Sequence, residues 1–70
     1  MIGKNLKEIR TARKELIPDV SKKVKISPDL LETIEKGEYD MDLGEFAELC
    51  HHYRVQMADI VSEDFKYSDK

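Results

Sequence analysis

The chain has little of several residue types, and each shortage narrows the classes of protein it can belong to. It contains one cysteine, which excludes an internal disulfide. It contains no run of about 18 apolar residues, so we expect no membrane-spanning segment. Glycine occurs three times and proline twice, and no stretch is repetitive or low in complexity. This composition favours helices joined by short loops.

The length also limits the function. A chain of 70 residues forms one small domain with a thin core, so a deep catalytic cleft is not expected. Lys4, Lys7 and Arg10 interrupt the apolar stretch that a signal peptide needs near its amino end. Together with the single cysteine, this predicts a cytoplasmic protein.

The charges are unevenly distributed along the chain. Residues 1–25 carry eight basic side chains and three acidic ones, whereas residues 26–70 carry four basic and twelve acidic ones. The formal net charge is −3, so the total conceals a positive first part and a negative second part. Solvated helix faces could produce such a pattern, but the asymmetry favours a charged partner or self-association.

The central stretch, residues 20–37, predicts two short helices joined by a tight turn. Val20 and Val24 form an apolar seam at i, i+4 spacing, and Leu31 and Ile34 form a second one. Ile26 falls in the turn between them. We expect the two seams to pack against each other.

The ends of the second of these helices are marked by capping residues. Ser27 is a good N-cap, and Pro28 falls at the first helical position, where its missing N–H costs nothing. Proline also disfavours helical geometry at Ser27, so the preceding helix cannot continue. Gly37 suits the left-handed residue that ends a helix.

Three further helices are expected around this pair. Helical periodicity predicts a first helix over residues 2–14. The second helix, which is the first of the central pair, is expected to start near Pro18. Asp42 and Glu45 form a capping box for the fourth helix. A short fifth helix should close the core after a turn at Val55. The residues that recur at helical spacing in the first helix are Ile2, Leu6, Ile9 and Arg13. The side chains expected to face the core from the fourth and fifth helices are Leu43, Phe46, Leu49, Cys50, Tyr53, Met57, Ile60 and Val61.

A helix, a turn, a serine-capped helix and then Ile34-Glu35-Lys36-Gly37 resemble the helix-turn-helix of phage repressors and Cro proteins, the XRE family. The resemblance extends from Ile2 to Val61. It implies an all-α, five-helix, lambda-repressor-like DNA-binding domain over residues 1–61, from a transcription regulator of a bacterial or phage-infected cell. Residues 62–70 are polar and expected to fray, although Phe65 and Tyr67 could dock on the domain or on a partner.

The resemblance also assigns structural roles to several residues. Arg10 and Glu35 match positions that the family uses for an ion pair between the first and third helices. Lys14 and Lys25 stand where the family commonly has a turn glycine, so Lys25 is expected in a left-handed conformation that costs about 1 kcal/mol.

The face that would read DNA has an unusual composition. In the family, the third helix enters the major groove, which maps base reading onto Ser27, Pro28, Asp29, Glu32 and Thr33. None of these is the Arg, Lys, Asn or Gln that base readout prefers. Asp29 and Glu32 could accept hydrogen bonds from cytosine, but they would have to approach a polyanion.

The expected phosphate contacts are also weakened. Ile17 occupies the position at which the family usually has a glutamine that contacts the DNA backbone. The loop after the third helix carries Glu38, Asp40 and Asp42, where polar or basic residues are usual. The candidate cations that are left are Lys22, Lys23, Lys25 and Lys36.

These observations favour a protein partner over direct DNA reading. Ile17 and Leu30 are expected to be exposed apolar residues beside acids, a combination that suits a protein with a basic surface. The favoured hypothesis is a modulator or anti-repressor that forms a heterodimer with a basic repressor of similar fold and blocks its operator binding. Its predicted contact residues are Ile17, Pro28, Asp29, Leu30, Glu32, Thr33 and Asp40.

Three alternatives stay open. The first is a homodimeric repressor that binds operator DNA and dimerises through the fifth helix and the tail. Its predicted DNA contacts are Ser27, Pro28, Asp29, Thr33, Lys36, Lys22 and Lys25. The second is an antitoxin or adaptor whose tail wraps a different partner. The third is a surface without a binding role.

Few residues could support catalysis or metal binding. Cys50, His51 and His52 are the candidates, but Cys50 falls at a small core position of the family. Adjacent histidines on a helix point about 100° apart and cannot converge on one ion. We therefore predict neither enzyme activity nor a cofactor nor a metal site.

Overall fold

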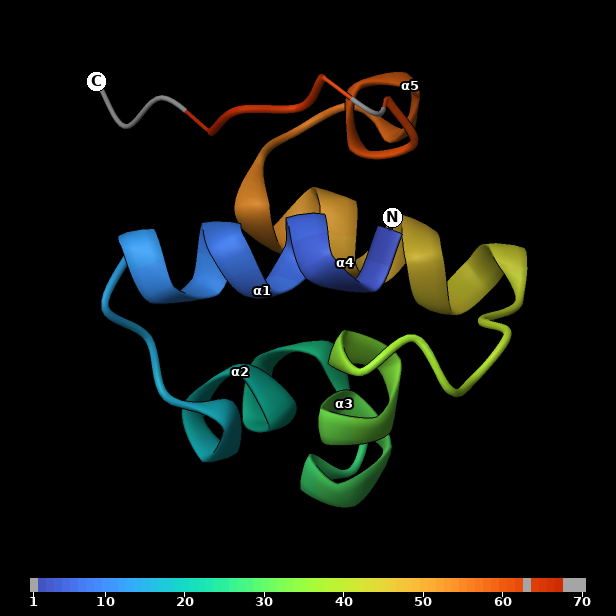
Figure 1. Cartoon of the computed structure of the whole chain (residues 1–70). Coiled ribbons are helices and arrows are strands. Elements are labelled where there is room, and N and C mark those ends of the chain that lie inside the picture. Colours follow the sequence, from blue (N-terminus) through green and yellow to red (C-terminus); the bar gives the residue numbers. More distant parts are fainter. Residues whose placement is uncertain (1, 63, 68–70) are drawn as a thin grey trace.

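The computed structural model describes residues 2–62 and 64–67. These residues form an all-α domain whose helices are α1 (Ile2–Ala12), α2 (Ile17–Val24), α3 (Pro28–Glu35), α4 (Leu43–Tyr53) and α5 (Met57–Ile60). Helices α2 and α3 form one layer below α1 and α4, and α5 lies above them (Figure 1). Among residues 2–62 and 64–67, no helix combines the length and the apolar character needed to cross a membrane.

The two central helices have the predicted caps. Ser27 has extended backbone geometry, and its hydroxyl oxygen accepts a hydrogen bond from the N–H of Leu30 at 3.2 Å. Pro28 is the first residue of α3, and Gly37 lies in the left-handed region with φ 78°. Lys25, in the turn between the helices, has φ 58°, as expected from its replacement of a glycine. The predicted helix-turn-helix is therefore present.

Two helix boundaries lie within one or two residues of the predicted ones. Helix α1 ends at Ala12 because Lys14 adopts a left-handed conformation with φ 57°, although the helix was expected to reach residue 14. Helix α2 begins at Ile17 and places Pro18 second. The second N–H of a helix lacks an intrahelical partner as well, so proline costs nothing at this position.

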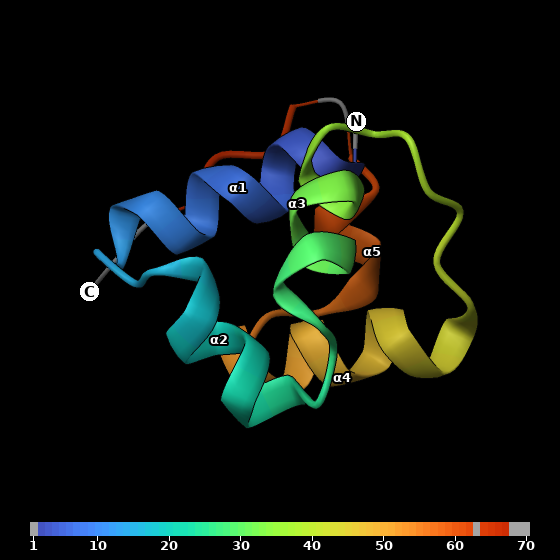
Figure 2. The ribbon, with the colours of Figure 1, turned by 90° about the horizontal axis from the view of Figure 1, so that it is seen from below.

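One core connects all five helices. Its buried members are Leu6, Ile9, Val20, Val24, Ile26, Leu31, Ile34, Leu49, Cys50, Tyr53 and Ile60. Helix α3 packs against α1 and α2, α2 also contacts α4, and α5 contacts α1 and α4. Viewed from below in Figure 2, α2 and α3 lie side by side across this core. The two central seams thus pack together as predicted.

Two side chains expected in the core are exposed. Leu43 is 72% exposed and Val61 is 54% exposed. Leu43 is the first residue of α4, and the amino end of this helix extends beyond α3 toward the loop of residues 37–42 (Figures 1 and 2). Val61 follows the last residue of α5. Both residues fit the helical periodicity of apolar side chains, but no neighbouring helix covers them.

The end of the chain docks on the domain through α1. Phe65 and Tyr67 are partly buried against the core, which is the docking on the domain that the sequence left open for these two residues. Asn5 is buried and donates from Nδ2 to the carbonyl oxygens of Ile60 at 2.6 Å and Ser62 at 3.2 Å. Residues 63 and 68–70 of the predicted tail lie outside the described residues, and the domain boundary at residue 61 stays a prediction.

Candidate recognition surface

Ser27 and Thr33, whose hydroxyls were predicted to contact DNA, form hydrogen bonds with backbone groups of α3. Ser27 caps α3, and Thr33 Oγ1 donates to the carbonyl oxygen of Asp29 at 2.9 Å. Because the Ser27 oxygen accepts in the cap, its proton stays available to an outside acceptor. The Thr33 proton is already used, which leaves that hydroxyl only as an acceptor. Ser27 is consequently the better of the two as a phosphate contact.

The outward side of α3 is negatively charged. Asp29 and Glu32 are exposed, and Glu38 and Asp40 continue the acidic surface beyond the helix. Lys36 is the residue that follows α3, and its Nζ lies 3.6 Å from Glu32 Oε1 in an exposed ion pair. Such a pair is largely screened by water and leaves the surrounding carboxylates uncompensated.

The expected apolar centre on this side is absent. Ile17 and Leu30 were predicted to be exposed, but both are half-buried and pack against the core. They also line separate grooves. Ile17 lies beside Lys7 and Lys36 in a groove of about 420 Å³, and Leu30 lies beside Lys25 in one of about 470 Å³. The acidic side chains, and not a joint apolar patch, are thus the distinctive feature of the α3 surface.

The candidate phosphate-binding lysines are spread over the domain. Lys22 and Lys23 line a groove of about 320 Å³ together with Lys14 and His52. Lys25 lines the groove of Leu30, where Asp42, Glu45 and Glu48 also lie, and Lys36 lies beside Glu32. The described structure does not gather these cations into one basic strip.

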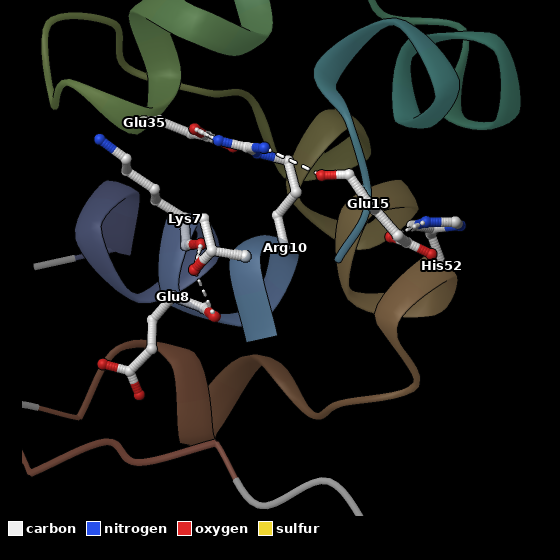
Figure 3. A network of polar contacts seen from close by, with 7 residues as sticks. Lys7, Glu8, Arg10, Glu15, Glu35 and His52 are labelled. Carbon is white, nitrogen blue, oxygen red and sulfur yellow. Dashed lines mark hydrogen bonds and ion pairs between the residues drawn. The ribbon is translucent and has the colours of Figure 1, made fainter. Parts of the chain in front are cut away.

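A two-point ion pair joins α1 to the end of α3 (Figure 3). Arg10 Nε donates to Glu35 Oε2 at 2.7 Å and Nη2 donates to Oε1 at 3.0 Å, while Nη1 donates to the Glu15 carbonyl oxygen at 3.0 Å. The Arg10 and Glu35 side chains are 13% and 7% exposed. The hydrogen bond to Glu35 raises the pKa of Arg10 by more than burial lowers it. Glu35 is therefore withdrawn from the recognition surface and has a structural role.

A second polar contact joins the α1–α2 connection to α4, and sequence reasoning missed it. Glu15 Oε1 lies 3.0 Å from His52 Nε2, and Glu15 Oε2 accepts from Arg13 Nη2 at 3.3 Å (Figure 3 shows the histidine contact). Burial raises the pKa of Glu15, but the hydrogen bonds and charges of His52 and Arg13 outweigh it and hold this pKa below the ordinary value of 4.5. No sequence motif links residues 15 and 52, which only the fold brings together.

Replacing Glu15 with glutamine is expected to flatten the acid side of the stability profile. A lowered pKa in the folded state contributes stability above the ordinary pKa of 4.5, and this contribution disappears as pH falls through the lowered value. The difference in free energy of unfolding between the wild type and E15Q should therefore shrink between about pH 6 and about pH 3. Urea unfolding at each pH measures it. Parallel profiles of the two proteins would show that Glu15 has no favourable contact.

The cysteine and histidines show no arrangement suited to chemistry. Cys50 is buried, and burial raises the pKa of its thiol, which disfavours the reactive thiolate. His52 contacts Glu15, whereas His51 is exposed. Among residues 2–62 and 64–67, no three His, Cys, Asp or Glu side chains gather in a way that could hold a metal ion.

The sequence matches one model of a known protein family, and this match supports the fold. Residues 5–45, more than half of the chain, match the family model described as helix-turn-helix domain. No curated protein and no solved structure shows a significant match. The match includes α2, the turn, α3 and the first residues of α4, the same segment in which the described geometry shows two packed helices and a serine cap. The chain belongs to the helix-turn-helix domain family, whose architecture is that of DNA-binding regulators.

Proposed function

We propose that this protein is a transcription regulator of the phage-repressor or Cro-like type that acts through a protein partner. The outward side of α3 would bind a basic repressor of similar fold and keep it from its operator. The observation that supports this proposal is the exposure of two carboxylates, Asp29 and Glu32, which the family resemblance assigns to base-reading positions. The half-burial of Ile17 and Leu30 makes charge the main attraction.

Both partners contribute to the electrostatic attraction. A reading helix that binds DNA presents cations to phosphates and to guanine edges. Carboxylates on a protein surface can occupy the same cations, because they match guanidinium and ammonium groups in charge and hydrogen-bonding geometry. Asp29 and Glu32 are one turn apart in α3 and are both exposed, so one partner helix could contact the two together.

The second candidate function is direct operator binding as a homodimer. The observation that favours it is the set of exposed lysines on and after α2, namely Lys22, Lys23 and Lys25, together with a Ser27 proton free to donate. Phosphate contacts of this kind give affinity that falls steeply with salt. Its weak point is the dispersion of these cations among separate grooves.

Removing the two carboxylates should affect the two mechanisms in opposite directions. The experiment measures fluorescence anisotropy of DNA from the protein's own control region, at low and near-physiological salt, with and without the adjacent repressor. We expect no binding by the protein alone and release of the repressor from DNA. The double variant Asp29→Ala and Glu32→Ala should release it at least about tenfold less effectively, since about 1.4 kcal/mol of lost attraction corresponds to a factor of ten.

The control is Asp59→Ala, which removes an exposed carboxylate from α5 and should leave repressor release unchanged. In the operator-binding mechanism the same double variant would bind DNA more tightly than the wild type, because two charges that repel phosphate are gone. Selective DNA binding by the wild type alone, strengthened in the double variant, would refute the protein-facing mechanism.

A further inference from the structure

A separate apolar groove of about 510 Å³ lies at the far end of α3. It forms where the start of α1, the end of α3, the loop of residues 37–42 and the start of α4 meet (Figure 2 shows these segments). Its apolar lining consists of Ile2, Ile34, Tyr39, Met41, Leu43 and Phe46. Ile34 belongs to the buried core, so the groove opens directly above the core.

Two of the lining side chains are large and exposed. Leu43 is 72% exposed and Tyr39 is 39% exposed, and both are among the large apolar side chains most exposed in the described chain. The Tyr39 hydroxyl donates to Glu45 Oε1 at 3.1 Å, which holds its ring beside the start of α4. This hydrogen bond ties one wall of the groove to α4.

The charge on the groove is of one sign. Asp40 and Asp42 belong to its lining, and none of the described side chains that line it is basic. Asp42 Oδ1 accepts from the N–H of Glu45 at 2.7 Å, whereas Asp40 is exposed, and no internal partner is found for it among the described contacts. Glu38 adds another exposed carboxylate to the same loop. An occupant would therefore combine an apolar group with neighbouring positive charge.

We propose that this groove docks a partner protein segment in which a large apolar side chain is flanked by lysine or arginine. The apolar side chain would cover Leu43 and Phe46, and the cations would meet Asp40 and Glu38. The inference deepens the proposed function and rests on it for the identity of the partner, a basic repressor. It names a contact outside the outward side chains of α3, so each surface can be tested separately.

The test uses the intact protein and a defined peptide. Amide chemical shifts are followed by NMR during titration with the hexapeptide acetyl-KKLFKK-amide and, in parallel, with acetyl-EELFEE-amide. We expect the basic peptide to shift the amides of residues 37–46 and the acidic peptide to leave them unchanged. Leu43→Ser should raise the dissociation constant by about tenfold, the effect of losing one leucine's apolar contact. Val61→Ser, which removes a similarly exposed side chain outside the groove, should leave it unchanged.

The variant Asp40→Lys separates the contribution of charge to peptide binding from the contribution of apolar contact. The variant should bind the basic peptide more weakly than the wild type does, because a positive charge replaces a negative one, and it should not lower any response to the acidic peptide. Equal binding of the two peptides, or shifts that survive both Leu43→Ser and Asp40→Lys, would overturn the inference. If sedimentation instead shows a dimer that Leu43→Ser dissociates, the occupant is a second copy and the basic-partner assignment is wrong.

The outcomes also distinguish this inference from the proposed function. If the peptide shifts only the amides of Asp29 and Glu32, the proposed binding site on α3 is supported and the proposed site in the groove is rejected. If the peptide binds in the groove and the protein alone binds its operator selectively, the groove is supported as a docking site and the anti-repressor mechanism is refuted.

Discussion

Gly3→Ala is expected to cause one of the largest losses of stability available from a single methyl group. A Cβ at residue 3 would approach the carbonyl oxygen of Ile34 more closely than unbonded atoms can, and it would lie 3.1 Å from the Glu35 carbonyl oxygen. Both obstacles are backbone atoms and cannot rotate away. Helix α1 would have to separate from the end of α3, which also strains the Arg10 ion pair. We expect a loss of about 3 kcal/mol or more, at or above the upper end of the usual overpacking range.

Gly44→Ala provides the matched control. This glycine also lies near the start of a helix, but the nearest atom to its added Cβ is Asp42 Oδ1 at 3.4 Å, an ordinary contact. Alanine there should not destabilise the protein and should stabilise it by up to about 1 kcal/mol, because glycine is a poor helix former. Urea unfolding followed by circular dichroism compares the two variants. Equal midpoints for G3A and G44A would contradict the close approach of α1 and α3.

Loss of either partner of the Arg10–Glu35 ion pair is expected to destabilise the domain by about 3–5 kcal/mol, because it leaves an uncompensated buried charge. The pair is joined by two hydrogen bonds and its side chains are largely buried, so water is a poor replacement for the missing partner. Such a loss is comparable to the whole stability expected of a domain this small. Arg10→Ala and Glu35→Ala are the two single variants to compare by urea unfolding.

The double variant Arg10→Ala and Glu35→Ala shows whether the unpaired charge causes the loss of stability. If the unpaired charge dominates, removing both partners should cost clearly less than the sum of the two single losses. The exposed pair of Glu32 and Lys36 is the control, and Lys36→Ala should change stability by no more than about 1 kcal/mol. Additive effects of the Arg10 and Glu35 variants would show that the two side chains act independently.

The sequence predicted most of the local structure because its signals act over a few residues. The Ser27 cap, the Gly37 turn and the Asp42–Glu45 capping box each involve backbone groups within one helical turn. The Arg10–Glu35 contact crosses a longer distance, and the family resemblance implied it before the geometry showed it. All-helical architecture and the helix-turn-helix followed from these signals.

Depth of burial could not be predicted in the same way. Periodicity assigned Leu43 and Val61 to the core, and the family resemblance placed Ile17 and Leu30 at exposed positions. In the structure Leu43 and Val61 are exposed, whereas Ile17 and Leu30 are half-buried. A periodic pattern identifies the side of a helix that is apolar, but the depth of a side chain depends on where the neighbouring helices end. The groove at Leu43 exists for this reason.

The sequence by itself determined the helices, their caps and the acidic character of α3, because capping, periodicity and charge are properties of neighbouring residues. Only the tertiary structure decided which charges are buried, which apolar side chains face solvent, and that Glu15 meets His52 and Asn5 meets Ile60. These contacts join residues far apart in the chain, and their positions depend on how all the helices pack around one core.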